Sequence, residues 1–188
     1  MAQISREELA QLPIRERILK AARNLALEEG WGNVSTRKIA EKIEYSTIKL
    51  YSEFGSKDAI LKELQIIGFQ TLYKRIAAIQ ALAQNPETAL LLYSSSMWAF
   101  ANEQSEMYEV MFGLNGASCK EQPVEEMRAT MLIINKAIQD IHPEAPFSYF
   151  NHWWAVMHGY IALQLGQPRF SEANILEAIS LFIKSIRQ

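Results

Sequence analysis

Apolar residues recur along this chain at the three- and four-residue spacing of amphipathic helices. The first such stretch follows Pro13 and ends at Gly30, a residue type that often terminates helices. Its apolar face consists of Ile14, Ile18, Leu19, Ala22, Leu25 and Ala26. No alternating apolar run flanked by hairpin dipeptides occurs. The pattern therefore predicts an all-α protein.

Two short helices are predicted next, each preceded by a serine that can cap it. Ser35 precedes the first, and Ser46 precedes the second, which Gly55 ends. Their apolar residues are Ile39, Ala40 and Ile43 in the first, and Ile48, Leu50, Tyr51 and Phe54 in the second. Ser56 can then cap a long fourth helix, expected from Lys57 to about Ala83.

The rest of the chain is predicted to be helical, with breaks at Asn85-Pro86, between Gly113 and Pro123, and between His142 and Pro146. The helices expected there cover about 86–103, 104–113, 122–140, 147–166 and 172–187. The stretch from Gly113 to Pro123 contains two glycines and Cys119, and we expect it to be a loop.

Two short helices joined by a tight turn and braced by a longer one are the arrangement of a helix-turn-helix. One short helix can enter the major groove of DNA while its neighbour holds it against the backbone. We therefore predict a three-helix DNA-binding head at residues 1–55. Residues 56–188 would form a larger helical body for effector binding and dimerisation, giving about nine helices in all.

The run from Arg15 to Leu64 resembles the N-terminal domain of the tetracycline-repressor (TetR) family. The matching positions are Arg17-Ile18-Leu19 with Ala21-Ala22, Glu29-Gly30, Ser35-Thr36-Arg37, Ile39-Ala40, Ser46, Leu50-Tyr51, Phe54 and Ser56-Lys57. The resemblance implies that DNA is contacted by Ser35, Thr36, Arg37, Ser46, Thr47, Lys49, Tyr51 and Lys57. Thr47 and Lys49 would face base edges or nearby phosphates, and the other contacts would be to phosphates, which hydroxyl groups, cations and helix N-termini all bind.

The chain departs from the family pattern in the turn before the second short helix. Glu44 stands where a glycine is usual, with Tyr45 after it, and Ile48 replaces a small residue. A glutamate in a left-handed turn costs energy that a glycine does not. A second hypothesis is therefore a helical small-molecule-binding or partner-docking protein whose head has weak or no DNA binding.

The body contains a concentration of aromatic and methionine side chains, which suit a pocket for a small apolar or aromatic effector. The candidate ligand-binding residues are Tyr93, Met97, Trp98, Phe100, Met107, Tyr108, Met111, Phe112, Trp154 and His158. The alternative for each of them is ordinary core packing.

The W-x-x-x-H-G pattern from Trp154 to Gly159 is similar to a C-terminal domain type found in part of the TetR family. There this helix and the last one pair with their copies in a second subunit. Gly159 within a helix costs roughly 1 kcal/mol relative to alanine, which close approach of another helix can offset. The expected homodimer interface consists of Trp153, Gly159, Ile161, Leu163, Ile175, Ile179, Phe182 and Ile186.

Composition and charge support a soluble regulator rather than an enzyme. The 188 residues carry a net charge of −2, with ten Lys/Arg against nine Asp/Glu in residues 1–60. A small local excess of positive charge is enough for a few phosphate contacts. One cysteine, no membrane-length apolar run and no apolar leader indicate the cytoplasm. The histidines at 142, 152 and 158 lack metal-ligand spacing, and we expect no metal, cofactor or catalytic residue.

Overall fold

The computed structural model describes residues 11–117 and 124–187, which form two compact units. The head unit comprises Met1–Gly68 and Gln104–Pro123, and the body unit comprises Phe69–Glu103 and Val124–Gln188. The described residues contain nine α-helices, one short 3-10 helix and no strand. The predicted all-α fold with a helix-turn-helix head and a helical body is confirmed. Residues 118–123 of the predicted loop, including Cys119, lie outside the described residues.

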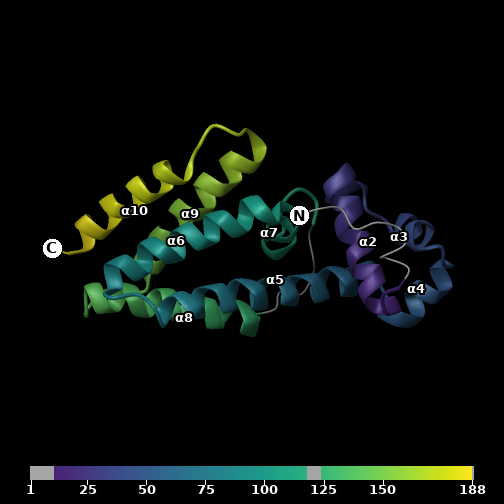
Figure 1. Ribbon diagram of the computed structural model, residues 1–188, viewed down its shortest axis with the longest axis horizontal. Coiled ribbons are helices and arrows are strands. Elements are labelled where there is room, and N and C mark those ends of the chain that lie inside the picture. The colour runs from purple at the N-terminus through teal and green to yellow at the C-terminus, as the bar shows by residue number, and fades with distance from the viewer. Residues whose placement is uncertain (1–10, 118–123, 188) are drawn as a thin grey trace. The chain divides into compact units, whose positions relative to one another are not determined.

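The head unit is built around α2 (Ile14–Glu29), which contacts α3 (Thr36–Ile43), α4 (Thr47–Phe54) and α7 (Ser105–Phe112) (Figure 1). The helix α5 (Lys57–Gln80) contributes its first part to this unit. These bounds lie within three residues of the predicted ones. A 3-10 helix, η1 (Trp31–Asn33), was not predicted, and its Trp31 is fully buried.

The three serine caps predicted from the sequence are present. The hydroxyl oxygens of Ser35, Ser46 and Ser56 each accept a hydrogen bond from the backbone N–H three residues later, at 3.2, 3.2 and 3.0 Å. The helix α3 ends as expected in a left-handed residue, Glu44, with φ 61° and ψ 40°. The N–H of Tyr45 then bonds to the carbonyl oxygen of Ala40 at 3.0 Å, which closes the helix and sets the tight turn.

The helix α7 is part of the head unit, although it lies far from the helix-turn-helix in sequence. The indole N–H of Trp31 donates to the backbone carbonyl of Glu106 at 2.8 Å, and the Nε of Arg23 donates to the Glu106 carboxylate at 2.9 Å. On the α5 side, the amide nitrogen of Gln65 donates to the carbonyl of Val110 at 2.9 Å. These bonds fix α7 to α2, η1 and the start of α5.

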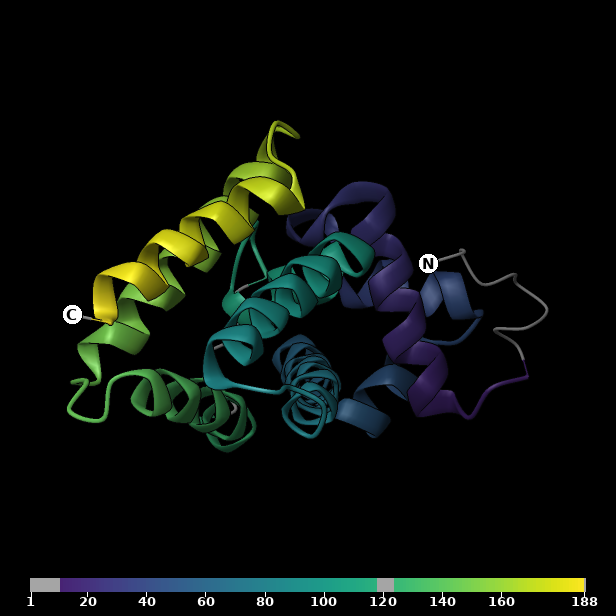
Figure 2. The same ribbon diagram turned by 60° about the vertical axis from the view of Figure 1, so that its left-hand side comes forward.

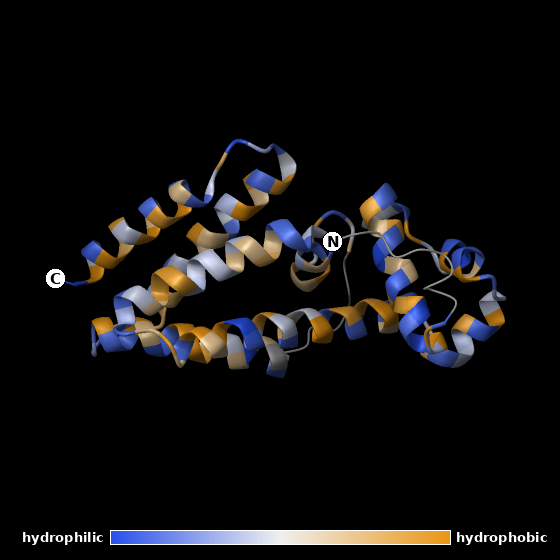
Figure 3. Cartoon of the chain, in the orientation of Figure 1, coloured by the Kyte–Doolittle hydropathy of each residue, from blue (hydrophilic) through white to orange (hydrophobic). Residues whose placement is uncertain are grey.

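The body unit combines the second part of α5 with α6 (Pro86–Glu103), α8 (Val124–Ile141), α9 (Ser148–Gly166) and α10 (Glu172–Ile186). The helix α6 contacts α8, α9 and α10, and α9 and α10 lie side by side (Figure 2). Hydrophobic and hydrophilic residues alternate along α10, as its period predicts (Figure 3). None of the described helices has the length and apolar content needed to cross a membrane.

Candidate nucleic-acid interface

The candidate DNA-contacting side chains are gathered at the N-terminal ends of α3, α4 and α5 in the head unit. Thr36 and Arg37 open α3, Thr47 and Lys49 lie in the first turn of α4, and Lys57 begins α5. Tyr51, one turn further along α4, brings its hydroxyl within 3.3 Å of the Thr36 hydroxyl. Helix N-termini and hydroxyl groups both donate hydrogen bonds to phosphate oxygens.

The helix α4 is anchored in the head unit by one fully buried side chain, Leu50. Its other side chains are partly or fully accessible, and Ile48, Lys49 and Tyr51 are exposed. A helix held through one side and open on the other can enter a groove without rearranging its own packing. The structure therefore agrees with a recognition-helix role for α4.

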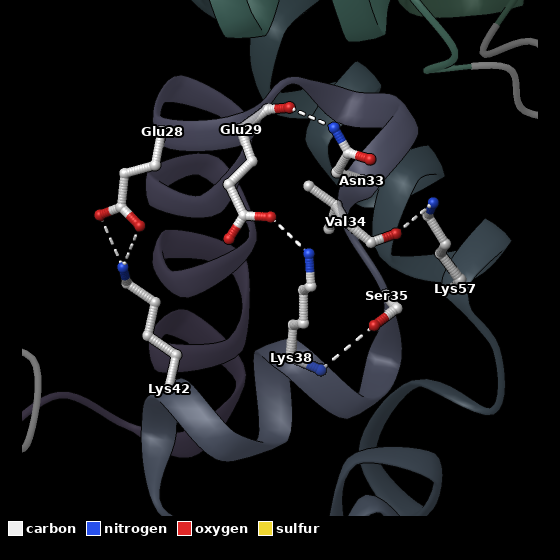
Figure 4. A network of polar contacts seen from close by, with 8 residues as sticks. All are labelled: Glu28, Glu29, Asn33, Val34, Ser35, Lys38, Lys42 and Lys57. Carbon is white, nitrogen blue, oxygen red and sulfur yellow. Dashed lines mark hydrogen bonds and ion pairs between the residues drawn. The ribbon is translucent and has the colours of Figure 1, made fainter.

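Every cation on α3 and α4 has a carboxylate partner. Arg37 pairs with Glu41 at 2.8 Å and Lys49 pairs with Glu53 at 2.6 Å, each one turn along the same helix. Lys38 pairs with Glu29, and Lys42 pairs with Glu28 at 2.7 Å, which ties α3 to the end of α2 (Figure 4). Because exposed ion pairs contribute little to stability, phosphate groups can replace the carboxylates.

Lys57 has a structural contact that the sequence did not indicate. Its ammonium group donates to the backbone carbonyl of Val34 at 2.6 Å (Figure 4). Partial burial lowers the pKa of Lys57 below the ordinary lysine value. The bond joins the first residue of α5 to the residue before the Ser35 cap, so it holds the N-terminal ends of α3 and α5 together.

Ser35 and Ser46 likewise have structural roles that compete with the predicted DNA contacts. Both hydroxyl oxygens accept the capping bonds described above. A capping hydroxyl still has a proton to donate. The two serines therefore position the helix ends and retain one hydrogen-bond donor each.

Residues 18–64 match the model of a known family, the bacterial regulatory proteins of the tetR family. The fold is also that of several solved structures. A protein with unknown function from Rhodococcus sp. RHA1 is 19% identical, with 95% of this chain and 97% of that chain covered and a TM-score of 0.78. The TetR family transcriptional regulator PfmR from Thermus thermophilus is 19% identical, with 89% and 97% covered and a TM-score of 0.65. A TetR-family transcriptional regulator from Bordetella parapertussis 12822 is 20% identical, with 90% and 93% covered and a TM-score of 0.70.

A comparison with curated protein sequences found no significant match. The family match covers the helix-turn-helix segment of the head unit, from α2 to the first part of α5. Residues 18–64 thus share the sequence pattern of the tetR family, and two solved TetR-family transcriptional regulators share the fold of the chain.

The candidate ligand-binding residues are divided between the two units. Tyr93, Met97, Trp98 and Phe100 are buried on α6 in the body unit, while Met107, Tyr108 and Met111 are buried on α7 in the head unit, with Phe112 half-buried. Trp154 and His158 are half-buried on α9, with their rings 4.3 Å apart. Burial lowers the pKa of His158 to about 4, so this imidazole is neutral at pH 7.

A cavity of about 220 Å³ lies in the body unit, between the α5–α6 connection and α8. Ala83, Pro86, Ala89 and Ile133 are among its apolar lining residues, and Lys136 and Asp140 are among its polar ones. Tyr93 also lines it, and is itself 2% exposed. Burial raises the pKa of the Tyr93 phenol.

The candidate interface residues fall into two sets. Trp153, Ile161, Ile175, Ile179 and Ile186 are buried within the body unit. Gly159 and Leu163 are exposed on α9, and Phe182 is half-buried on α10. Leu181, which belongs to the apolar stripe of the last helix, is exposed beside Phe182. A second chain could therefore reach Gly159, Leu163, Leu181 and Phe182, whereas the buried set already packs inside its own chain.

Proposed function

We propose that the protein is a ligand-responsive transcriptional repressor that binds a near-palindromic operator as a homodimer and is released by a small apolar or aromatic effector. The observation that carries the proposal is the packing of α4. One buried side chain, Leu50, holds the helix, while Ile48, Lys49 and Tyr51 face outward from it. Two such helices in one dimer would read successive major grooves about 34–36 Å apart.

Dimerisation through α9 and α10 is supported by their exposed apolar surface. Leu163 and Leu181 are 58% and 59% exposed, and an added Cβ at Gly159 would meet no atom within 4 Å. Adjacent helices with outward apolar side chains can form a four-helix interface with their copies. This surface would also fix the distance between the two recognition helices.

Effector binding is supported by the cavity beside Tyr93. Its lining combines apolar side chains and the Tyr93 ring with polar groups that include Lys136 and Asp140, which would suit a small aromatic molecule that also carries hydrogen-bonding groups. A ligand that favours a dimer unable to match the operator spacing would weaken operator binding by the coupling free energy, typically about 1–3 kcal/mol.

The first experiment is a binding titration with duplexes selected from fragments of the gene's own neighbourhood. Lys49→Ala is expected to weaken binding to the selected duplex more than binding to random duplex. Equal losses would make Lys49 a phosphate contact instead of a base-reading residue. Lys74→Ala, on an exposed face of α5 outside the head unit, serves as the matched charge control.

The dimer is tested separately by sedimentation of Leu163→Asp and Gly159→Asp. Both are expected to give monomers, because a carboxylate would have to be buried in the interface. Leu132→Asp is the control, since Leu132 is 56% exposed on α8. Dimers that survive the α9 changes would place the interface elsewhere.

The second candidate function is a helical binding protein with a head that reads DNA weakly or not at all. It is favoured by the carboxylate partners of all cations on α3 and α4. This function predicts no salt-dependent DNA binding, whereas an operator-binding repressor loses affinity steeply as salt rises.

A further inference from the structure

Ile48 is the most exposed large apolar side chain among the described residues of the head unit. It is 80% exposed, compared with 48% for Leu27 and Tyr51 and 44% for Tyr45. It lies in the first turn of α4, between Thr47 and Lys49. Its side chain therefore contributes almost nothing to the packing of its own chain, although it stands on the helix that carries the candidate base contacts.

The other side chains of α4 offer few ways to recognise a base. The helix Thr47–Phe54 contains no arginine, asparagine or glutamine, the residues that make bidentate bonds to guanine or adenine. Its one cation, Lys49, is paired with Glu53. Specific hydrogen bonding from this helix is thus left to hydroxyl groups and to Lys49 and Glu53, which are paired with each other.

An exposed isoleucine has one chemical match in the major groove. Each thymine presents its C5-methyl group there, and this methyl is the apolar feature that distinguishes its edge. Contact between a branched aliphatic side chain and this methyl removes apolar surface of both from water. A polar base edge offers isoleucine no such gain. The donors and acceptors of the base would lose their hydrogen bonds to water, and isoleucine has no polar group to replace them.

We propose that Ile48 is a specificity-determining residue that packs against the C5-methyl group of a thymine in each half of the operator. The inference rests on the proposed DNA-binding function and extends it to the base that is read. It adds an apolar base contact to the base-reading role that is proposed for Lys49.

The test compares duplexes that differ by a single methyl group. An operator is first selected from a random-sequence duplex library with the full-length protein, and each thymine is then replaced by deoxyuridine. At one thymine in each half-site, removal of the methyl group is expected to weaken binding about fourfold, which corresponds to the burial of one methyl group. At that position a 5-methylcytosine pair should likewise bind more tightly than a cytosine pair.

The variant Ile48→Ala identifies the protein side of the contact. It is expected to bind the thymine and deoxyuridine duplexes equally, whereas Leu27→Ala, an exposed apolar change on α2, should retain the fourfold difference. Because Ile48 is 80% exposed, its truncation should leave the thermal unfolding midpoint unchanged, which excludes misfolding as the cause.

The outcomes separate this inference from the proposed function. Salt-dependent binding to a selected duplex that no deoxyuridine weakens would overturn the thymine contact and leave the DNA-binding function intact. A methyl effect that persists in Ile48→Ala would assign the contact to another residue and also overturn the inference. Selection of no duplex at all would overturn the proposed function and this inference with it.

Discussion

Replacing Gly68 by alanine tests how α7 is seated on α5. A Cβ built on Gly68 would stand 2.6 Å from both Cγ and Sδ of Met111 and 3.4 Å from Cε of Met107. Non-bonded carbon atoms prefer separations of about 3.5–4.0 Å, so Met111 must move by roughly 1 Å. Met111 is fully buried, and such overpacking typically costs about 1–3 kcal/mol. Alanine within a helix regains about 1 kcal/mol relative to glycine, which leaves a net destabilisation of about 1 kcal/mol.

The assay is urea denaturation of the unchanged protein, Gly68→Ala, Met111→Ala and the double variant. Unfolding is monitored by the loss of the helical circular dichroism signal. In the Met111→Ala background the clashing atoms are gone, and Gly68→Ala should then stabilise the protein by about 1 kcal/mol. The sign of the Gly68→Ala effect is thus expected to reverse between the two backgrounds. The same sign in both backgrounds would refute the packing of Met111 against Gly68.

Three further changes probe other parts of the chain. Trp31→Phe removes the buried 2.8 Å bond to the Glu106 carbonyl and should lower the free energy of unfolding by about 1–3 kcal/mol in urea titrations. Glu44→Gly removes the strain of a left-handed glutamate, about 1–2 kcal/mol, and adds a conformational-entropy cost of about 0.5–1 kcal/mol. Calorimetry should therefore show the free energy of unfolding rise by roughly 0.5–1 kcal/mol. A decrease would contradict the turn geometry. His158 has a pKa of about 4 in the folded protein, below its unfolded value of about 6.5, so the unfolded chain takes up this proton first. The free energy of unfolding should therefore fall between pH 6.5 and 4, and a pH series on His158→Leu should lack this component.

The elements of the fold were predictable because their signals are local. Helical period, serine caps and helix-ending glycines act over a few residues, and the observed helices begin and end close to the predicted positions. The left-handed Glu44 also followed from its place in the turn. The resemblance placed the candidate DNA contacts on the N-terminal ends of three helices, where the structure has them.

The tertiary contacts could not be predicted in the same way. Nothing near Trp31 in the sequence indicates Glu106, 75 residues away, yet their hydrogen bond draws α7 into the head unit. As a result, the aromatic and methionine stretch expected to form one pocket is divided between two units. Lys57 is predicted to contact a phosphate, and nothing in the sequence indicated that its ammonium group also donates to the Val34 carbonyl.

By itself, the sequence determined that the chain is helical, where its helices start and stop, and that its first part is a helix-turn-helix. The tertiary structure decided what covers each apolar face. Trp153, Ile161 and Ile179 have the helical spacing of apolar residues that predicts burial. Only the folded chain shows that its own helices bury them, while Leu163 and Ile48 remain exposed. The physical reason is that an apolar stripe specifies burial and not the partner that provides it, because the hydrophobic effect is non-directional.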